Sequence, residues 1–566
     1  MLRSLVGSEM CIRDRLLVPS GELQRTVADD AQHTLPNFRQ GDAIVLYERN
    51  ADTDNVTNKM VFKGNIDYLN ENEICIRLRA TQQNSSVLPS DSLYAIEHDA
   101  MDTTFRSMYQ GLYAFMSATK ERRDLLLSQR EPQFDVALDK QIAEAADDFT
   151  RIALKAKAAK DYFLLVGPPG TGKTSCALKK MVETFYKEEG AQILLLSYTN
   201  RAVDEICKAL SSIRPEVDFI RVGSELSCDE NYRDHLIENE LATCMRRTEV
   251  CERINRCRIL VGTVASISGK PELFRLKHFD VAIVDEATQI LEPQLLGILC
   301  AKGENGKEGV GKFILIGDHK QLPAVVLQNT EQSEVYDEAL SAVGLKNLKD
   351  SLFERLYRTA RQHTDAHRTY DMLCRQGRMH PEVALFANQA FYEGRLLPVG
   401  LPHQLEDSGN INRLSFYPSQ PEPMGSSAKT NHSEAKIAAR LAATVYKEHS
   451  EAFDASRTLG IITPYRSQIA LIKKEIEVLG ISELNQILID TVERFQGSER
   501  DVIIYSFCVN YPYQLKFLSN LTEEDGILID RKLNVALTRA RKQMLLTGVP
   551  TLLERNPLYK SLLKLI

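Results

Sequence analysis

A chain of 566 residues is long enough for several domains, and its 43% hydrophobic and 26% charged content is ordinary for a globular protein. A formal net charge of −7 excludes a general attraction to nucleic acid, while leaving room for a local groove of lysines and arginines. No apolar run is long enough to cross a membrane, and eleven scattered cysteines without a C-x-x-C pair indicate free thiols rather than a disulfide framework.

Residues 17–100 have the pattern of β-strands separated by polar turns. Three stretches rich in β-branched and aromatic residues make up this pattern, at 42–48, 60–68 and 73–79. An antiparallel β-barrel closes such strands without exposed edges, so we predict a barrel as an accessory domain. Residues 1–16 mix charged and small residues without the apolar core of a signal peptide, and we predict them to be non-native or disordered.

Helical spacing follows the barrel. Apolar residues recur on one face between Thr103 and about Leu127, which predicts a helical stalk over residues 101–132. We expect this face to be a packing surface, made of Phe105, Met108, Leu112, Phe115 and Met116.

From Tyr162 onward, short apolar runs alternate with helical patterns, as in parallel sheets that are covered on both faces. Two α/β domains of similar construction are therefore predicted, over residues 133–368 and 369–566. The apolar runs of the first are 162–166, 192–197, 258–262, 281–284 and 313–317, and those of the second are 459–463, 501–506 and 543–547.

The segment Gly167-Pro168-Pro169-Gly170-Thr171-Gly172-Lys173-Thr174 matches G-x-x-x-x-G-K-[ST]. An apolar strand precedes it and a helical pattern follows, so the N–H groups of the turn and the positive end of the helix face an anion. Lys173 is then expected to reach the β- and γ-phosphates, and the Thr174 hydroxyl to ligate Mg²⁺. This context predicts a nucleoside-triphosphate site rather than a chance match in a glycine-rich loop.

Two further polar segments follow strands of the first α/β domain. Asp285 and Glu286 end the run 281–284, where one acid can hold Mg²⁺ and the other can orient or deprotonate the attacking water. A solvated pair of surface acids is the alternative. Gln321 follows the run 313–317, and an amide there can report on the γ-phosphate, although taken alone an ordinary loop glutamine explains it equally well.

The second α/β domain has no phosphate loop and offers arginines instead. Arg378 lies in Q-G-R-M-H-P, and Arg539 lies in L-N-V-A-L-T-R-A-R. Guanidinium groups brought from a facing domain stabilise the charge on a transferring phosphoryl group. For any single arginine, a weak surface ion pair is the alternative.

Four cysteines lie close together in the sequence, at Cys228, Cys244, Cys251 and Cys257. Four thiolates can hold zinc or an iron–sulfur cluster. The irregular spacing favours ordinary thiols and leaves a metal as the alternative.

Nine sequence blocks occur in a fixed order: GPPGTGKT, SYTNRAVD, GTVAS, VDEATQ, GDHKQLP, RMHP with FYEG, ITPY, VERFQGSE and LNVALTRAR. They resemble the superfamily-one helicases, and more narrowly the 5′→3′ branch that includes the nonsense-mediated-decay RNA helicase and the DNA-replication helicase–nuclease. The barrel and stalk fit the same branch. The resemblance implies an α/β fold with two RecA-like P-loop domains and parallel sheets, preceded by a small antiparallel β-barrel and a helical stalk.

The resemblance also implies a role for each matching residue. The loop Gly167 to Thr174 would bind the phosphates of ATP, with Mg²⁺ held by Thr174 and Asp285. The catalytic set would be Lys173, the base Glu286, the γ-phosphate sensor Gln321 and the arginine fingers Arg378 and Arg539, with Glu499 near the ATP ribose. The blocks that contact the nucleic-acid strand in relatives contain Thr199, Asn200, Thr263, Pro464, Tyr465 and Thr491.

The sequence departs from the family pattern at the adenine. Relatives carry a tyrosine that stacks on adenine immediately before the arginine of the RMHP block, and Gly377 stands there in this chain. Relatives also carry a glutamine at a fixed distance before the phosphate loop, and the nearest candidate, Gln141, lies several residues too far upstream. The resemblance therefore leaves the reading of the base open.

The resemblance implies an ATP- and Mg²⁺-dependent helicase or translocase that moves 5′→3′ on a single strand and unwinds duplexes. We expect DNA as the strand because SYTNRAVD followed by FIRVG is closer to the DNA-replication relative. The alternatives are an RNA helicase, a nucleic-acid-binding switch that does not unwind, and, more distantly, an unrelated P-loop kinase or NTPase. We expect no membrane association and no nuclease activity, and a location in the cytoplasm of a bacterium or in the nucleus or cytoplasm of a eukaryote.

Overall fold

The computed structural model describes residues 9–13, 16–17, 38, 41–69, 73–80, 87–89, 92–99, 102–304, 306–326, 328, 330–362, 365–407, 409, 412–423, 427–524 and 526–566. The chain divides into two compact units, residues 1–105 and 106–566. Among the helices of the described ranges, none is both long and apolar enough to cross a membrane.

The N-terminal unit is built on a six-stranded sheet in the order β1-β5-β4-β3-β6-β2. Its neighbouring strands pair antiparallel, except that β2 pairs with β6 in parallel. The predicted strands are present, and Ile44, Leu46, Ile66 and Ile76 point into a shared core. The strands are β1 (Glu9–Arg13), β2 (Leu16–Leu17), β3 (Ala43–Glu48), β4 (Val61–Leu69), β5 (Glu73–Leu78) and β6 (Tyr94–His98).

Strand β1 lies inside the segment that we expected to be non-native or disordered. Its backbone pairs with β5 from Glu9 opposite Arg77 to Arg13 opposite Glu73. Leu16, the last residue of that segment, begins β2, and residues 1–8 and 14–15 lie outside the described residues.

The predicted stalk consists of two helices, α1 (Asp102–Met116) and α2 (Lys120–Leu126). Thr119 starts the second helix because its hydroxyl accepts a hydrogen bond from the N–H of Arg122. The packing face also differs from the expectation. Phe115 packs against the core together with Ala114 and Ala118, whereas Phe105, Leu112 and Met116 are exposed.

The first α/β domain contains a seven-stranded sheet in which every pair of neighbours is parallel. In sheet order the strands are β13 (Tyr370–Met372), β7 (Tyr162–Val166), β12 (Val310–Gly317), β11 (Phe279–Val284), β8 (Ile193–Ser197), β10 (Ile259–Thr263) and β9 (Phe219–Val222). We expected the second domain to begin at residue 369, but β13 pairs with β7, so the first sheet extends to Met372.

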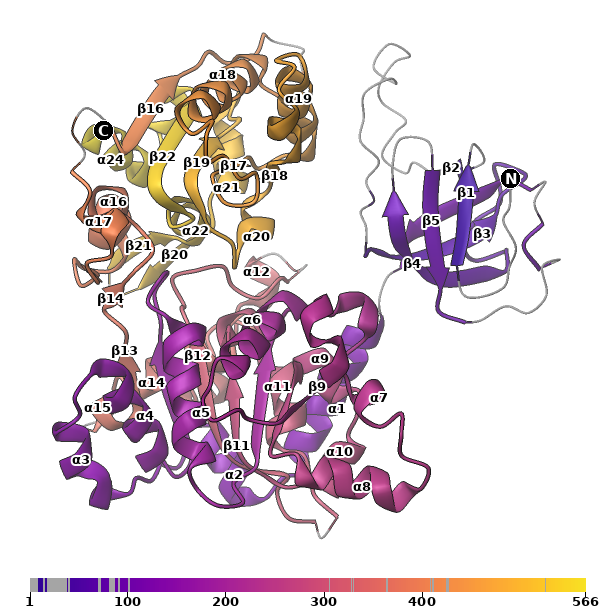
Figure 1. Cartoon of the computed structure of the whole chain (residues 1–566), viewed down its shortest axis with the longest axis vertical. Helices are drawn as coiled ribbons and strands as arrows, with labels where there is room; N and C mark the ends of the chain where they lie inside the picture. The colour runs from indigo at the N-terminus through magenta and orange to yellow at the C-terminus, as the bar shows by residue number, and fades with distance from the viewer. Residues whose placement is uncertain are drawn as a thin grey trace. The chain divides into compact units, whose positions relative to one another are not determined.

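The second α/β domain contains a five-stranded parallel sheet (Figure 1). In sheet order its strands are β16 (Leu414–Pro418), β22 (Ala540–Gly548), β19 (Arg500–Ser506), β17 (Leu459–Ile462) and β18 (Leu488–Asp490). Two small ribbons accompany it, β14 (Arg375–Gln376) with β15 (Leu397–Pro398) and β20 (Leu521–Glu524) with β21 (Ile527–Asp530).

Helices cover both faces of the two large sheets (Figure 1). Those of the first domain are α3 (Asp139–Ala143), α4 (Asp148–Ala158), α5 (Lys179–Tyr186), α6 (Asn200–Ser211), α7 (Ile237–Glu240), α8 (Arg247–Arg256), α9 (Val264–Ser268), α10 (Glu272–Leu276), α11 (Glu292–Leu299), α12 (Thr330–Ser333), α13 (Glu338–Ala342), α14 (Leu352–Ala360) and α15 (Ala366–Thr369). Those of the second are α16 (Pro381–Phe391), α17 (Pro402–Leu405), α18 (His432–Glu448), α19 (Arg466–Glu477), α20 (Val492–Phe495), α21 (Leu515–Leu518), α22 (Arg531–Leu537), α23 (Pro550–Leu553) and α24 (Pro557–Leu565).

The alternation of side chains along the strands explains why both sheet faces are covered. In β7, Tyr162, Leu164 and Val166 join the core on one face, and Phe163 and Leu165 join the core on the other. Because all strands of each large sheet are parallel, their carboxyl ends share one edge. Ligands of open α/β sheets bind at that edge, and the predicted site residues of the first domain follow strands there. In the second domain Pro464, Tyr465 and Thr491 also follow strands, whereas Glu499 and Arg539 come immediately before β19 and β22.

Candidate active site

The phosphate loop follows β7 and leads into a π-helical turn, Lys173–Leu178, that continues as α5. Gly170 and Gly172 have φ of +73° and +77°, which side-chain-bearing residues rarely adopt. At Gly167, a Cβ would lie 2.1 Å from Cγ of Lys173. The glycines therefore let the backbone close tightly around an anion.

The side chains of the loop are arranged around its own backbone and the end of β11. Nζ of Lys173 donates to the carbonyl of Gly167 at 2.8 Å and lies 3.8 Å from Oε1 of Glu286. The hydroxyl of Thr174 donates to the carboxylate of Asp285. Thr171 ties the turn together through a hydrogen bond from its hydroxyl to the carbonyl of Pro168 at 2.7 Å.

Asp285 and Glu286 leave the end of β11 in different environments. Asp285 is buried, and burial first and the charge of Glu286 second raise its pKa to about 6. Glu286 has φ of +53°, a left-handed conformation that is uncommon outside glycine and that turns its side chain toward the loop. Gln289 donates to Oε2 of Glu286 at 3.0 Å and fixes the carboxylate.

Oxygen donors suited to Mg²⁺ meet at this point. A hydroxyl and a carboxylate oxygen, from Thr174 and Asp285, are in contact, and Mg²⁺ is usually bound by one or two such groups together with substrate phosphates and waters. The residues present therefore fit the ion that the sequence implies.

Gln321 is buried behind the loop, after β12. Its Nε2 donates to Oδ2 of Asp318 at 2.8 Å, and its Oε1 accepts from Nη2 of Arg539 at 3.5 Å. Arg539 comes from the second domain, at the junction of α22 and β22. The two sequence-predicted residues are thus in contact across the two domains.

Arg539 is almost completely buried. Burial first and the neighbouring charge of Arg378 second lower its pKa to about 9, against the opposite effect of Glu286. Carbonyls of Val535 and Ser498 accept hydrogen bonds from its guanidinium at 3.1 and 3.3 Å. These contacts hold the guanidinium toward the first domain.

Arg378 and Glu499 form an ion pair at 2.5 Å between Nε and Oε2. Burial raises the pKa of Glu499, but the charges of Arg378 and then Arg541 outweigh it and lower the pKa. The backbone next to Arg378 also touches the phosphate loop, because the N–H of Gly377 donates to the carbonyl of Gly170 at 2.8 Å. Arg378 therefore lies beside the loop, with Glu499 in contact with it.

A chain of hydrogen bonds joins the same two domains, and its residues are not among the predicted site residues. The hydroxyl of Tyr392 donates to Asp318 at 2.7 Å and accepts from Asn534 at 2.8 Å. Asn534 also donates to the carbonyl of Lys320 at 2.7 Å. Tyr392 belongs to the FYEG block and Asn534 to the LNVALTRAR block. The sequence blocks therefore contain both residues, but they do not indicate that the two side chains are in contact.

The predicted strand contacts all follow strands at the carboxyl edges of the two sheets. Thr199 caps α6 after β8, and Thr263 caps α9 at the end of β10, each accepting from an N–H in its helix. Asn200 is the first residue of α6. In the second domain, Pro464 and Tyr465 follow β17, and Thr491 follows β18.

Two protein-family profiles match this chain, and both are described as AAA domains. One matches residues 348–551, and the other matches residues 143–250 and 239–329. The DNA replication ATP-dependent helicase/nuclease DNA2 of Bos taurus is 27% identical over 585 residues, which cover 93% of this chain and 49% of that protein. The DNA polymerase alpha-associated DNA helicase A of Saccharomyces cerevisiae is 26% identical over 482 residues, which cover 72% of this chain and 65% of that protein.

These matches support the resemblance of the chain to the superfamily-one helicases. The chain is related to the branch that contains the DNA-replication helicase–nucleases, and it spans about half the length of the bovine relative. A solved complex of an arterivirus nonstructural protein 10 helicase with DNA covers 70% of this chain and 62% of its own, at 16% identity and a TM-score of 0.34. A likeness that distant says nothing further about this chain.

The surroundings of Gly377, where the chain departs from the family pattern, are apolar. A Cβ at Gly377 would lie 3.1 Å from Cδ1 of Leu401 and 3.8 Å from Cγ2 of Val399. Aliphatic side chains therefore lie beside the position where relatives carry tyrosine. Gln141 is exposed on α3.

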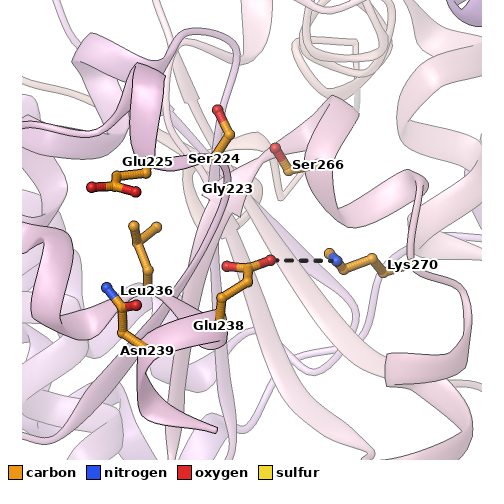
Figure 2. A pocket seen from close by; sticks show the side chains of 8 residues that line it. All are labelled: Gly223, Ser224, Glu225, Leu236, Glu238, Asn239, Ser266 and Lys270. Carbon is orange, nitrogen blue, oxygen red and sulfur yellow. Dashed lines mark ion pairs between the residues drawn. The ribbon is translucent and has the colours of Figure 1, made fainter. Parts of the chain in front are cut away.

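A pocket of about 450 Å³ lies beside Thr263, between the ends of β9 and α9 (Figure 2). Ser266, which lines it, donates its N–H to the hydroxyl of Thr263 at 3.0 Å. Glu238 and Lys270 face each other across it at 4.0 Å. With Glu225 as a second carboxylate and Lys270 as the lone ammonium in its lining, the pocket has no excess of positive charge for a phosphate.

The cysteine cluster has no metal-like geometry in the described part of the chain, where no three His, Cys, Asp or Glu side chains gather around a point that could hold an ion. Cys228 instead contacts the guanidinium of Arg221, and Cys257 is buried beside the carbonyl of Ile259.

Proposed function

We propose that this chain hydrolyses ATP between its two α/β domains and uses the cycle to move 5′→3′ along single-stranded DNA and to separate duplexes. One observation carries the proposal. Arg539 of the second domain reaches Gln321 of the first at 3.5 Å, while Gly377 contacts the phosphate loop at 2.8 Å. Residues suited to bind, hydrolyse and sense a γ-phosphate are thereby divided between two domains that can separate.

The chemistry follows from these positions. Lys173 and the loop N–H groups bind the phosphates, and Glu286 takes a proton from the water that attacks the γ-phosphorus. The bond from that phosphorus to the bridging oxygen breaks, and ADP and phosphate leave. Arg539 and Arg378 supply positive charge to the oxygens of the transferring group. Thr174 and Asp285 would hold Mg²⁺, which would supply positive charge to the phosphate oxygens.

Movement follows from the connection between Gln321 and the second domain. A γ-phosphate that contacts Gln321 and Arg539 favours closure, and its loss removes that preference. The residues Thr199, Thr263, Tyr465 and Thr491 lie at the carboxyl edges of the two sheets. A strand laid along both edges is then gripped alternately as the domains open and close.

DNA rather than RNA is the proposed strand because the two relatives described above are named as DNA helicases. The alternatives are an RNA helicase and an ATP-driven switch that binds a strand without unwinding it. Both would use the same site and differ in the track or in the outcome of hydrolysis.

Steady-state ATP hydrolysis without nucleic acid, with single-stranded DNA and with single-stranded RNA tests the proposal, with Lys173→Ala as the blank. We expect strong stimulation by DNA and none in Lys173→Ala, because that variant lacks the phosphate contact. Stimulation by RNA alone would replace DNA with RNA as the track. Hydrolysis that neither strand stimulates would refute the proposed motor.

A further inference from the structure

A cluster of three aromatic rings, two of them exposed and one half-buried, follows β19 on the second α/β domain. We call Tyr511, Tyr513 and Phe517 the aromatic turn. The rings of Tyr511 and Tyr513 stack with centroids 5.8 Å apart and 12° between their planes, and Phe517 meets Tyr513 edge-on at 6.5 Å. Tyr513 is 55% exposed and Phe517 64% exposed. Single exposed apolar residues are common, but an ordered set of exposed rings marks a binding surface.

The aromatic turn is held rigidly from beneath by Gln514. This residue is 2% exposed, and its Oε1 accepts from the N–H groups of Asn510 and Tyr511, each at 2.9 Å. Its Nε2 donates to the carbonyl of Ala428 at 2.6 Å and to the hydroxyl of Tyr465 at 3.2 Å. Leu518, at the end of the same segment, is buried in the core. The rings are therefore displayed on an ordered backbone, which reduces the entropy cost of binding.

The aromatic turn is continuous with the predicted strand contact of the second domain. Strands β17 and β19 are parallel neighbours, with Ile462 opposite Tyr505, so the segments that follow them leave the same edge of the sheet. Pro464 and Tyr465 follow the first strand and the aromatic turn follows the second. The bond from Gln514 to the Tyr465 hydroxyl joins the two directly.

The charge of the surroundings suits a nucleic-acid backbone. Lys516 lies within the aromatic turn, and Lys429 belongs to the loop that Gln514 holds through Ala428. Both lysines are exposed, and neither takes part in the ion pairs found among the described residues. Positive charge beside stacked rings is the combination that single-strand-binding surfaces use.

We propose that Tyr513 and Phe517 form a stacking platform for the bases of a single DNA strand that continues past Tyr465. This inference rests on the proposed function and adds to it a site outside the sequence blocks that define the family. Stacking accepts any base because every base has a flat face. The platform therefore grips the strand without reading its sequence.

The chain contains no tryptophan, so Tyr513→Trp introduces a single fluorescent reporter at the platform. We expect oligo(dT) to quench its emission, because a stacked base quenches an indole. Tyr446→Trp is the matched control. Tyr446 lies near the carboxyl end of α18. The other end of that helix is capped by Asn431, which lies beside the aromatic turn because its side chain donates a hydrogen bond to Asn510. About fifteen residues of helix carry Tyr446 roughly 22 Å away, toward the opposite edge of the sheet, and we expect no quenching there.

Affinity measurements separate stacking from attraction to phosphate. Tyr513→Ala and Phe517→Ala should each weaken binding of oligo(dT) about five- to a hundredfold, the effect of losing one stacked base. Binding of an abasic DNA strand of the same length should be unchanged, because it has no bases to stack. Hydrolysis of ATP without nucleic acid should also be unchanged, since both rings lie on the surface.

The outcomes distinguish this inference from the proposed function. Suppose the wild-type protein binds oligo(dT) and hydrolyses ATP faster with it, but the emission of the Tyr513→Trp variant is not quenched and the alanine variants bind normally. The platform is then refuted and the motor stands. If the wild-type protein binds no strand, both the stacking platform and the proposed motor are refuted. Quenching by oligo(U) alone would support stacking and assign the platform to RNA.

Discussion

The proposed chemistry depends on three side chains that influence one another directly. Glu286 lies 3.8 Å from Lys173, and the charge of Glu286 raises the pKa of Arg539 while burial and Arg378 lower it to about 9. Lys173 is proposed to bind phosphate, Glu286 to accept a proton and Arg539 to stabilise the transition state. Single substitutions should therefore separate these roles.

Glu286→Gln should leave ATP binding intact and lower turnover about 10²- to 10⁴-fold, because the amide cannot take the proton of the attacking water. Titration with a fluorescent ATP analogue and steady-state hydrolysis measure the two effects. Glu272→Gln, an exposed acid of the same domain, is the control and should hydrolyse ATP normally. Normal turnover in Glu286→Gln would show that another group is the base.

Arg539→Lys should lower turnover about 10³- to 10⁵-fold, the effect of losing an arginine finger. Lysine keeps a positive charge but lacks the planar fork that reaches Gln321 and the carbonyls of Val535 and Ser498. Thermal unfolding of the same variant measures any loss of stability separately. Arg555→Lys, at an exposed position, should change neither quantity, and unchanged turnover in Arg539→Lys would remove Arg539 from the site.

Glu434 gives the second domain a pH-dependent stability. Burial raises its pKa from the ordinary 4.5 to about 7, although Cys508, Ser506 and Ser419 donate hydrogen bonds to it. The folded state holds this proton more tightly than the unfolded state does. The contribution of Glu434 to the free energy of unfolding is therefore greatest below pH 4.5 and is lost as the pH rises through 7.

Glu434→Gln should remove that pH dependence. The free energy of unfolding of the wild-type protein should fall by about 2–3 kcal/mol more than that of the variant between about pH 4.5 and pH 8. Urea unfolding at both pH values measures the difference, and other titrating groups cancel in the comparison. If the free energy of unfolding changed equally with pH in the two proteins, the raised pKa of Glu434 would be contradicted.

At the scale of elements, the sequence predicts best where a strand is continuous and apolar. The run 162–166 coincides with β7, and the run 281–284 forms the last four residues of β11 (Phe279–Val284). Short strands with polar residues are missed, as in β13, because three residues carry no periodicity. Within the predicted stalk, hydrophobic periodicity does not mark the break between α1 and α2, where Thr119 caps the second helix.

The predicted packing face of α1 differs from the observed one because a glycine makes the contact. Gly111 lies so close to α11 that an added Cβ would be 1.8 Å from the carbonyl of Pro293. Small residues therefore make the contact, and hydrophobic periodicity gives weight only to large apolar side chains. A close approach of two backbones leaves no such signal in one sequence.

Gly111→Ala should destabilise the protein by about 1–3 kcal/mol, because α1 must move away from α11. Gly269→Ala is the control. Its Cβ would meet atoms only at 3.5 Å or more, so its stability should stay near that of the wild type or rise slightly. Thermal unfolding of both variants checks this, and a Gly111→Ala protein as stable as the control would contradict the close approach.

At the scale of the whole molecule, the ordered blocks predict that ATP lies between two α/β domains, but they do not predict which side chains meet there. The contact of Arg539 with Gln321 joins residues far apart in the sequence. The same is true of Asn534 with Lys320 and of Arg531 with Glu354, the latter an ion pair at 2.6 Å. Such contacts depend on how two domains pack, and a single sequence holds no record of that packing.

The central claim is that hydrolysis at this interface drives movement along one strand in one direction. Unwinding of DNA duplexes with a 5′ tail, a 3′ tail or blunt ends, measured with ATP and with Lys173→Ala as the blank, tests it most directly. We expect separation of the 5′-tailed duplex alone, and none by the variant. Separation of the 3′-tailed duplex instead, or hydrolysis stimulated by DNA with no duplex separated, would contradict it.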